Sequence, residues 1–82
     1  MAYVYILLSL RSSITYTGST MNLEKRIYEH NKGYEKSTKK YIPWKLVYTE
    51  EYNNISDARK REKYLKSAAG RRYIKKLDII RE

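Results

Sequence analysis

Five polar side chains in this sequence are of the types that hydrolyse phosphodiester bonds. They are two tyrosines near the N-terminus, an arginine and a histidine in the segment that follows, and a glutamate further along: Tyr5, Tyr16, Arg26, His30 and Glu62. A carboxylate can bind a divalent cation, a guanidinium can neutralise a phosphate, and a phenol or an imidazole can move a proton. Together these groups are able to hold a phosphodiester and one metal ion.

The two tyrosines belong to short triplets, YVY at residues 3–5 and YTG at residues 16–18. Both triplets fall in segments rich in β-branched and aromatic residues, which predicts strands over residues 3–9 and 14–19. A short polar link joins these segments, so we expect an antiparallel hairpin that carries both triplets.

Side-chain alternation in these strands determines which tyrosines can meet. Tyr3 and Tyr5 project from one face of the first strand. Tyr16 can approach Tyr5 across the hairpin, and two aromatic rings stacked only as core are the alternative interpretation. Gly18 is expected to give the backbone freedom at the strand exit.

A helix is predicted over residues 23–31, with Asn22 as its N-cap and Gly33 at its C-terminal stop. One face of this helix carries two apolar residues together with Arg26 and His30. A purely structural stripe would be apolar throughout, so both polar side chains are expected at the border of the core. The structural alternative is a snorkelling arginine and a histidine satisfied at the core edge.

A second helix is predicted from Ser56 to about Ser67. One face combines three apolar residues with one carboxylate: Ala58, Glu62, Leu65 and Ala69. An unpaired buried carboxylate is costly, so Glu62 needs a metal ion, an arginine or hydrogen-bond donors. An ion pair with Arg26 that only joins two helices is the structural alternative.

The remaining segments complete the order of elements. Residues 34–44 are expected to form a loop, residues 46–51 a third strand, and residues 71–80 a third helix after a break at 68–70. The order β-β-α-β-α-α predicts an α/β fold, with a small three-stranded, mostly antiparallel sheet flanked by three helices. We expect one domain over residues 1–82.

The charge is strongly unbalanced, with 18 Lys and Arg against 9 Asp and Glu and a formal net charge of +9. Such an excess attracts polyanions, so nucleic acid is the expected partner, with DNA favoured over RNA. The basic helices carry too few large apolar groups for a membrane surface. The candidate phosphate contacts are basic residues of the loop and the third helix: Lys36, Lys39, Lys40, Arg71 and Arg72. For each of them an ordinary solvated charge is the alternative.

The cellular location is indicated by what the sequence lacks. There is no cysteine, which excludes disulfides and thiolate metal sites and makes a reducing compartment the simplest location. The N-terminus shows no signal-peptide pattern, and the longest apolar run, Val4 to Leu8, is too short to span a bilayer. We therefore expect a soluble, cytoplasmic protein.

With these residues placed, the sequence resembles a GIY-YIG nuclease domain. The triplets YVY and YTG stand where the two tyrosine motifs of the family belong, Arg26 and His30 follow in the segment RIYEH, and the later helix carries Glu62. The similarity covers nearly the whole chain and is closest to a free-standing form of the N-terminal nuclease domain found in the bacterial excision-repair nuclease. Each triplet alone is a weak signal, but the ordered set is specific.

The triplets depart from the family pattern at three positions. Tyr3 stands in place of glycine, and Val4 and Thr17 each stand in place of isoleucine, whereas the functional tyrosines are retained. Some relatives carry a lysine directly after the second triplet, where Ser19 stands here. Any role of that lysine is not carried over.

The resemblance implies a metal-dependent endonuclease that acts in repair or other processing of DNA. Glu62 would hold a single Mg²⁺ or Mn²⁺ ion, and Arg26 would neutralise charge that develops on the phosphate. Tyr5 would act as base or relay, Tyr16 as a positioning group, and His30 would share the proton transfer. A free phenol has a pKa of about 10, so a base role requires a lowered pKa. A covalent tyrosine intermediate ranks lower.

Two functions of other classes fit parts of the same sequence. A nucleic-acid-binding module of the same fold would keep the basic surface without useful catalysis. A small basic protein that docks on an acidic partner would keep the tyrosines only as core. Because few residues lie beyond the predicted core, we expect a partner protein to supply targeting.

Overall fold

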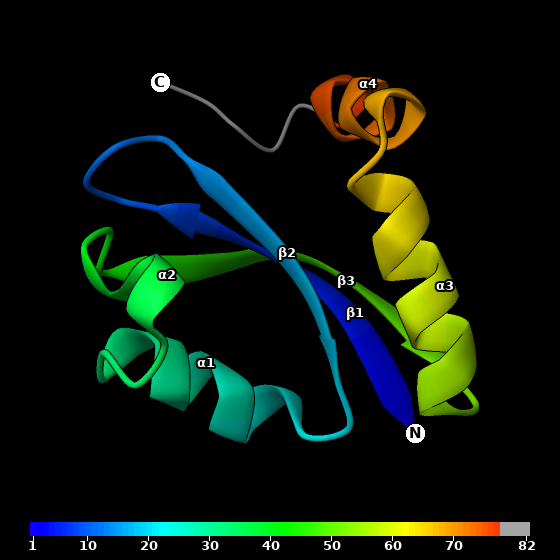
Figure 1. Ribbon diagram of the computed structural model, residues 1–82, viewed down its shortest axis with the longest axis horizontal. Helices are drawn as coiled ribbons and strands as arrows, with labels where there is room; N and C mark the ends of the chain where they lie inside the picture. The colour runs from blue at the N-terminus through cyan, green and yellow to red at the C-terminus, as the bar shows by residue number, and fades with distance from the viewer. Residues whose placement is uncertain (78–82) are drawn as a thin grey trace.

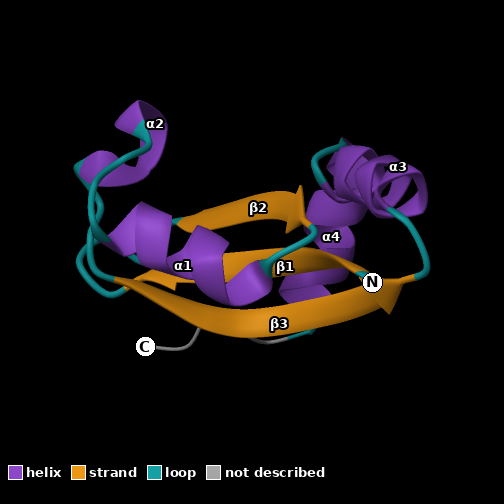
Figure 2. Cartoon of the chain, turned by 90° about the horizontal axis from the view of Figure 1, so that it is seen from below, coloured by secondary structure: helices purple, strands orange, loops and turns teal. Residues whose placement is uncertain are grey.

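The computed structural model describes residues 1–77 of the chain. Its elements follow in the order β1 (Ala2–Ser9), β2 (Thr15–Thr20), α1 (Leu23–Asn31), α2 (Lys36–Lys39), β3 (Trp44–Tyr52), α3 (Ile55–Leu65) and α4 (Ala68–Lys76). The strands form one antiparallel sheet in the order β2-β1-β3. Figure 1 shows α1 and α2 on one side of the sheet and α3 and α4 on the other, and Figure 2 shows the sheet from below. The predicted α/β class and antiparallel sheet are confirmed.

β1 is the central strand, and its alternate side chains enter two separate cores. Val4 and Ile6 pack with Leu65 on the side of α3 and α4. Tyr5 and Leu7 point to the other side and pack under α1. Because both faces of β1 are buried, residues on either side of the sheet are held close to the same strand.

The first helix and the third strand follow from signals within the chain. α1 has the predicted bounds, and the Asn22 side chain accepts from the backbone N–H of Lys25 at 3.1 Å. Gly33 follows the helix with a φ of +80°, a conformation that favours glycine. β3 is longer than the predicted 46–51, because its pairing with β1 extends from Trp44 to Tyr52.

The predicted loop over residues 34–44 is wrong in part, because it contains the short helix α2. Four polar residues are too few to show a helical period. α2 is therefore a fourth helix beside the three that were predicted.

Two helix starts also differ from the prediction. α3 begins at Ile55, because the Asn54 side chain caps it by accepting from the N–H of Asp57 at 2.8 Å, so Ser56 is not the cap. The predicted break at 68–70 is wrong, since these residues form the first turn of α4. The predicted end at Ile80 lies outside the described residues. Within residues 1–77, no helix has the length and apolar character needed to cross a membrane.

Candidate active site

Tyr5 and Tyr16 come together on the α1 side of the sheet. β1 pairs with β2 so that Tyr5 lies opposite Gly18 and Leu7 lies opposite Tyr16, which makes the tyrosines diagonal neighbours. Their ring centroids are 6.3 Å apart. A Cβ on Gly18 would lie 2.5 Å from the hydroxyl oxygen of Tyr5. The Tyr5 hydroxyl therefore lies over the backbone of the edge strand, where glycine leaves room for it.

A chain of buried hydrogen bonds leads from this hydroxyl to α2. Tyr5 Oη lies 3.1 Å from His30 Nε2, and His30 Nδ1 lies 2.9 Å from Thr38 Oγ1. The Thr38 hydroxyl donates to the carbonyl of Glu35 at 3.4 Å, so its oxygen is free to accept from Nδ1–H. Nε2 is then the acceptor for the Tyr5 hydroxyl. His30 is fully buried, and not at the border of the core as predicted.

Burial determines the protonation of this pair. It raises the pKa of Tyr5 to about 12, against the opposing effect of Arg26. Burial, and then the positive charge of Arg26, lower the pKa of His30 below its ordinary value of 6.5. At neutral pH the phenol is therefore protonated and the imidazole neutral. The pKa of Tyr5 is shifted away from the range that a direct tyrosine base requires, and the geometry fits a relay instead.

Arg26 is held beside this pair by two carboxylates. Its Nη1 lies 3.2 Å from Glu29 Oε1, and its Nη2 lies 2.9 Å from Glu35 Oε1. Its side chain is 27% exposed, so it remains accessible to a ligand. The alternative in which Arg26 pairs with Glu62 is wrong, because its partners come from α1 and from the residue that precedes α2.

Glu62 approaches the edge strand from the other face of the sheet. Ser19 alternates with Gly18 and so faces α3, where its hydroxyl donates to Glu62 Oε1. Lys66 Nζ donates to Glu62 Oε2 at 2.7 Å and also lies 5.7 Å from the ring centre of Tyr16. Hydrogen-bond donors thus satisfy the carboxylate, and Glu62 meets the tyrosines at β2 from the opposite face.

A polar network holds the neighbouring turn of α3 against β3. Arg61 donates from Nε and Nη2 to the two oxygens of Glu50, at 2.9 and 3.1 Å. The hydroxyls of Tyr48 and Tyr52 also donate to Glu50. Because Arg61 directly precedes Glu62, this network fixes the turn of the helix that carries the candidate metal ligand.

Four residues that complete the arrangement were missed by sequence reasoning: Ser19, Glu35, Thr38 and Lys66. Only the lysine had a local signal, since it follows Glu62 at i+4 on the same helix. Ser19 and Glu62 are 43 positions apart, and no pattern in the sequence joins them.

The predicted phosphate contacts divide into two groups on opposite sides of the sheet. Three lysines lie on or next to α2, and two arginines lie on α4: Lys36, Lys39, Lys40, Arg71 and Arg72. All five are exposed. Their positions allow contact with a ligand that is longer than the site itself.

The donor set at β2 fits one divalent ion. Within the part of the chain that is described, no group of three or more His, Cys, Asp or Glu is arranged to hold a metal. The Glu62 side chain is 21% exposed at the sheet edge. One carboxylate with several waters is a usual binding mode of Mg²⁺. An ion bound there would compete with the Lys66 ammonium for Oε2.

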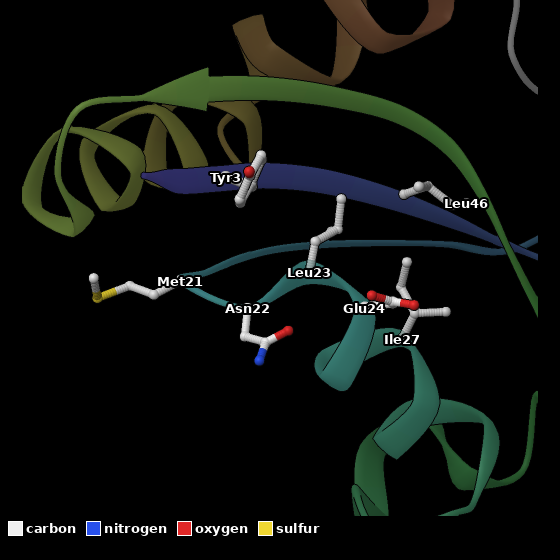
Figure 3. Close-up of a pocket in the computed structure, with 7 residues that line it drawn as sticks. All are labelled: Tyr3, Met21, Asn22, Leu23, Glu24, Ile27 and Leu46. Carbon is white, nitrogen blue, oxygen red and sulfur yellow. The ribbon is translucent and has the colours of Figure 1, made fainter.

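A hollow of about 430 Å³ lies apart from these residues, next to the start of α1 (Figure 3). Tyr3, Leu23, Ile27 and Leu46 are among the residues that line it. None of the five candidate catalytic residues does. The candidate active site is therefore the surface around β2 and not this hollow.

Comparisons with known proteins agree on one family. The family model described as the GIY-YIG catalytic domain matches residues 1–76. The chain is 51% identical over 67 residues to a UPF0213 protein of Clostridium perfringens, which covers 80% of this chain and 71% of that protein. It is 40% identical over 82 residues to a UPF0213 protein of Syntrophus aciditrophicus, covering 98% and 90%. The solution NMR structure of a UPF0213 protein from Bacillus halodurans aligns with a TM-score of 0.54 at 31% identity, covering 94% of this chain and 85% of that one.

Proposed function

The chain belongs to the family of GIY-YIG catalytic domains, and from this premise we propose that it is a metal-dependent endonuclease that hydrolyses phosphodiester bonds. The family implies nuclease chemistry and a nucleic-acid substrate. DNA as that substrate, a function in repair or other DNA processing, a cytoplasmic location and targeting by a partner protein are the finer parts of the proposal. The meeting of Tyr5, Tyr16 and Glu62 at the edge strand β2 carries it.

Glu62 and Arg26 are the proposed groups that deal with charge. Glu62 would hold a single Mg²⁺ or Mn²⁺ ion, which when bound offsets negative charge on the phosphoryl oxygens. Arg26 would donate its forked N–H groups to the phosphate. Because Glu29 and Glu35 occupy two of these nitrogens at 3.2 and 2.9 Å, phosphate binding would exchange at least one of the two contacts.

Tyr5 and His30 are the proposed path for the proton of the attacking water. Tyr5 Oη takes a proton from water while its own proton passes to His30 Nε2, 3.1 Å away. The water oxygen bonds to phosphorus, the bond from phosphorus to the leaving oxygen breaks, and that oxygen takes up a proton from solvent. Tyr16, whose ring centroid is 4.8 Å from that of His30, is the proposed positioning group.

A second candidate function is a nucleic-acid-binding module of the same fold with weak or no catalysis. The observation in its favour is Lys66 Nζ, which lies 2.7 Å from Glu62 Oε2. An ammonium that excludes the divalent ion would leave the basic surface intact and the site inactive.

Nicking of supercoiled plasmid separates the two functions. Wild-type protein and Lys66→Met would be incubated with Mg²⁺, with Mn²⁺ and with EDTA. The nuclease proposal predicts nicking by the wild type with a divalent ion and none in EDTA. The binding module predicts salt-sensitive binding without nicking by the wild type, and nicking only in the variant. A wild type that cuts neither plasmid, branched DNA nor RNA would overturn the nuclease proposal.

A further inference from the structure

Two hollows beside the candidate active site join into one trough between β2 and the end of the α3–α4 hairpin. Their volumes are about 230 and 370 Å³, and they share Thr15, Arg71 and Ile74 as lining residues. Because the two hollows have these residues in common, a ligand can pass from one to the other without leaving the surface.

The trough begins at the candidate active site. The hollow nearer to the site is also lined by Tyr16 and Lys66. Lys66 Nζ is the atom that donates to Glu62 and lies 5.7 Å from the Tyr16 ring centre. A chain that leaves a phosphate held at Glu62 therefore enters the trough past Lys66.

The trough carries positive charge along its length. Lys66, Arg71, Arg72 and Lys75 line it, and all four side chains are exposed. Among the described residues, none of those that line either hollow is an aspartate or a glutamate. Four cations without a lining carboxylate suit a polyanion with regularly spaced charges.

Its floor is apolar where its rim is basic. Leu65 and Ile74 are buried beneath the trough, and Thr15 and Thr17 of β2 form its other wall. Phosphates on the rim and sugar rings over an apolar floor match the two sides of a nucleic-acid backbone. Contacts of this kind give affinity and register without a choice of sequence.

We propose that this trough binds the sugar–phosphate backbone of the strand that continues from the scissile phosphate on one side of the cut. The proposal rests on the proposed nuclease function for the position of the cut. It assigns Arg71 and Lys75 to one defined flank of the substrate.

Binding in EDTA tests the trough without any need for cleavage. Fluorescence anisotropy would follow a labelled DNA of about 16 nucleotides, single-stranded and as a duplex, because single-strand sites span that range. Arg71→Glu and Lys75→Glu are the variants, and Lys60→Glu, an exposed lysine of α3 that lines neither hollow, is the matched control. We expect each trough variant to weaken binding about tenfold and to lower the slope of log K against log salt by about 1, as loss of a phosphate contact does. The control should change binding less than twofold.

Cleavage of trimmed substrates then locates the flank. Removal of nucleotides on one side of the cut should raise KM for the wild type and have little effect on Arg71→Glu, because the same contact is lost only once. Equal binding losses in Arg71→Glu and Lys60→Glu would overturn the trough. So would a trimming effect that is the same in wild type and Arg71→Glu. If the wild type cuts nothing, the nuclease proposal fails and the anisotropy comparison alone decides the trough.

Discussion

At the scale of single residues, the position of the Tyr5 hydroxyl depends on Gly18. The glycine lies within β2 and not at the strand exit, and the positive φ angles belong to other residues, Ser13 and Gly33. Its importance is the missing side chain, since a Cβ would stand 2.5 Å from Tyr5 Oη. A methyl group there would displace the phenol from its hydrogen bond to His30.

We expect Gly18→Ala to lower the free energy of unfolding by about 1–3 kcal/mol, the usual cost of an overpacked core. Urea denaturation measures this change. In a Tyr5→Ala background the added methyl group should have no such cost, because the ring that it meets is gone. A destabilisation that persists unchanged in that background would contradict the contact.

The pH dependence of cleavage reports on His30. Because burial and the charge of Arg26 lower the pKa of His30 below 6.5, the imidazole is neutral at pH 7 and can accept the proton of Tyr5. We expect activity to be full at neutral pH and to fall, as pH decreases, with a midpoint below 6.5. The pH–rate profile of kcat measures it, and His30→Gln should lose this acidic limb. A midpoint above 6.5, or the same limb in His30→Gln, would argue against the relay.

At the scale of elements, the short helix α2 contributes more to the site than its length indicates. Thr38 accepts from the buried Nδ1 of His30, and Glu35, which precedes the helix, pairs with Arg26 at 2.9 Å. Trp44 Nε1 donates to the carbonyl of Thr38 at 3.0 Å, which ties α2 to β3. α2 thus orients two of the five candidate catalytic residues.

Thr38→Val removes the hydroxyl and keeps the shape of the side chain. We expect a loss of about 1–3 kcal/mol in unfolding free energy, because the buried N–H of His30 loses its acceptor. Nitrogen NMR shifts of the imidazole should show a change from the Nδ1–H tautomer, together with slower cleavage. Ser37→Ala, at the exposed neighbouring position, is the control and should change neither. A Thr38→Val protein with the wild-type tautomer and rate would contradict this role.

The same element shows how far sequence reasoning reaches. The strands, α1 and its Asn22 cap follow from local patterns, and all of them are in the structure. α2 has four residues and no period, so its contact with His30 could not be predicted. The residue types of the site were identifiable because each departs from an apolar stripe. Their partners were not, since Ser19 reaches Glu62 only through the packing of α3 on β2.

At the scale of the whole molecule, the sheet separates the catalytic groups and its edge brings them together. Tyr5 and His30 lie on the α1 side and Glu62 on the α3 side, and they meet at β2, the outermost strand beside β1. The edge strand is accessible to a ligand as large as a nucleic acid, whereas a closed cleft would not be. The net charge of +9 favours such a ligand.

The most direct test of this account is single-turnover cleavage by Glu62→Gln, with binding measured on the same preparation. Glutamine keeps the size of the side chain and an acceptor for Ser19 but removes the charge that would hold the ion. The account predicts that metal-dependent cleavage falls by at least about a hundredfold, roughly 2.7 kcal/mol of barrier, while affinity for DNA in EDTA is equal to or greater than that of the wild type. Cleavage by Glu62→Gln at the wild-type rate would contradict the assignment of the site.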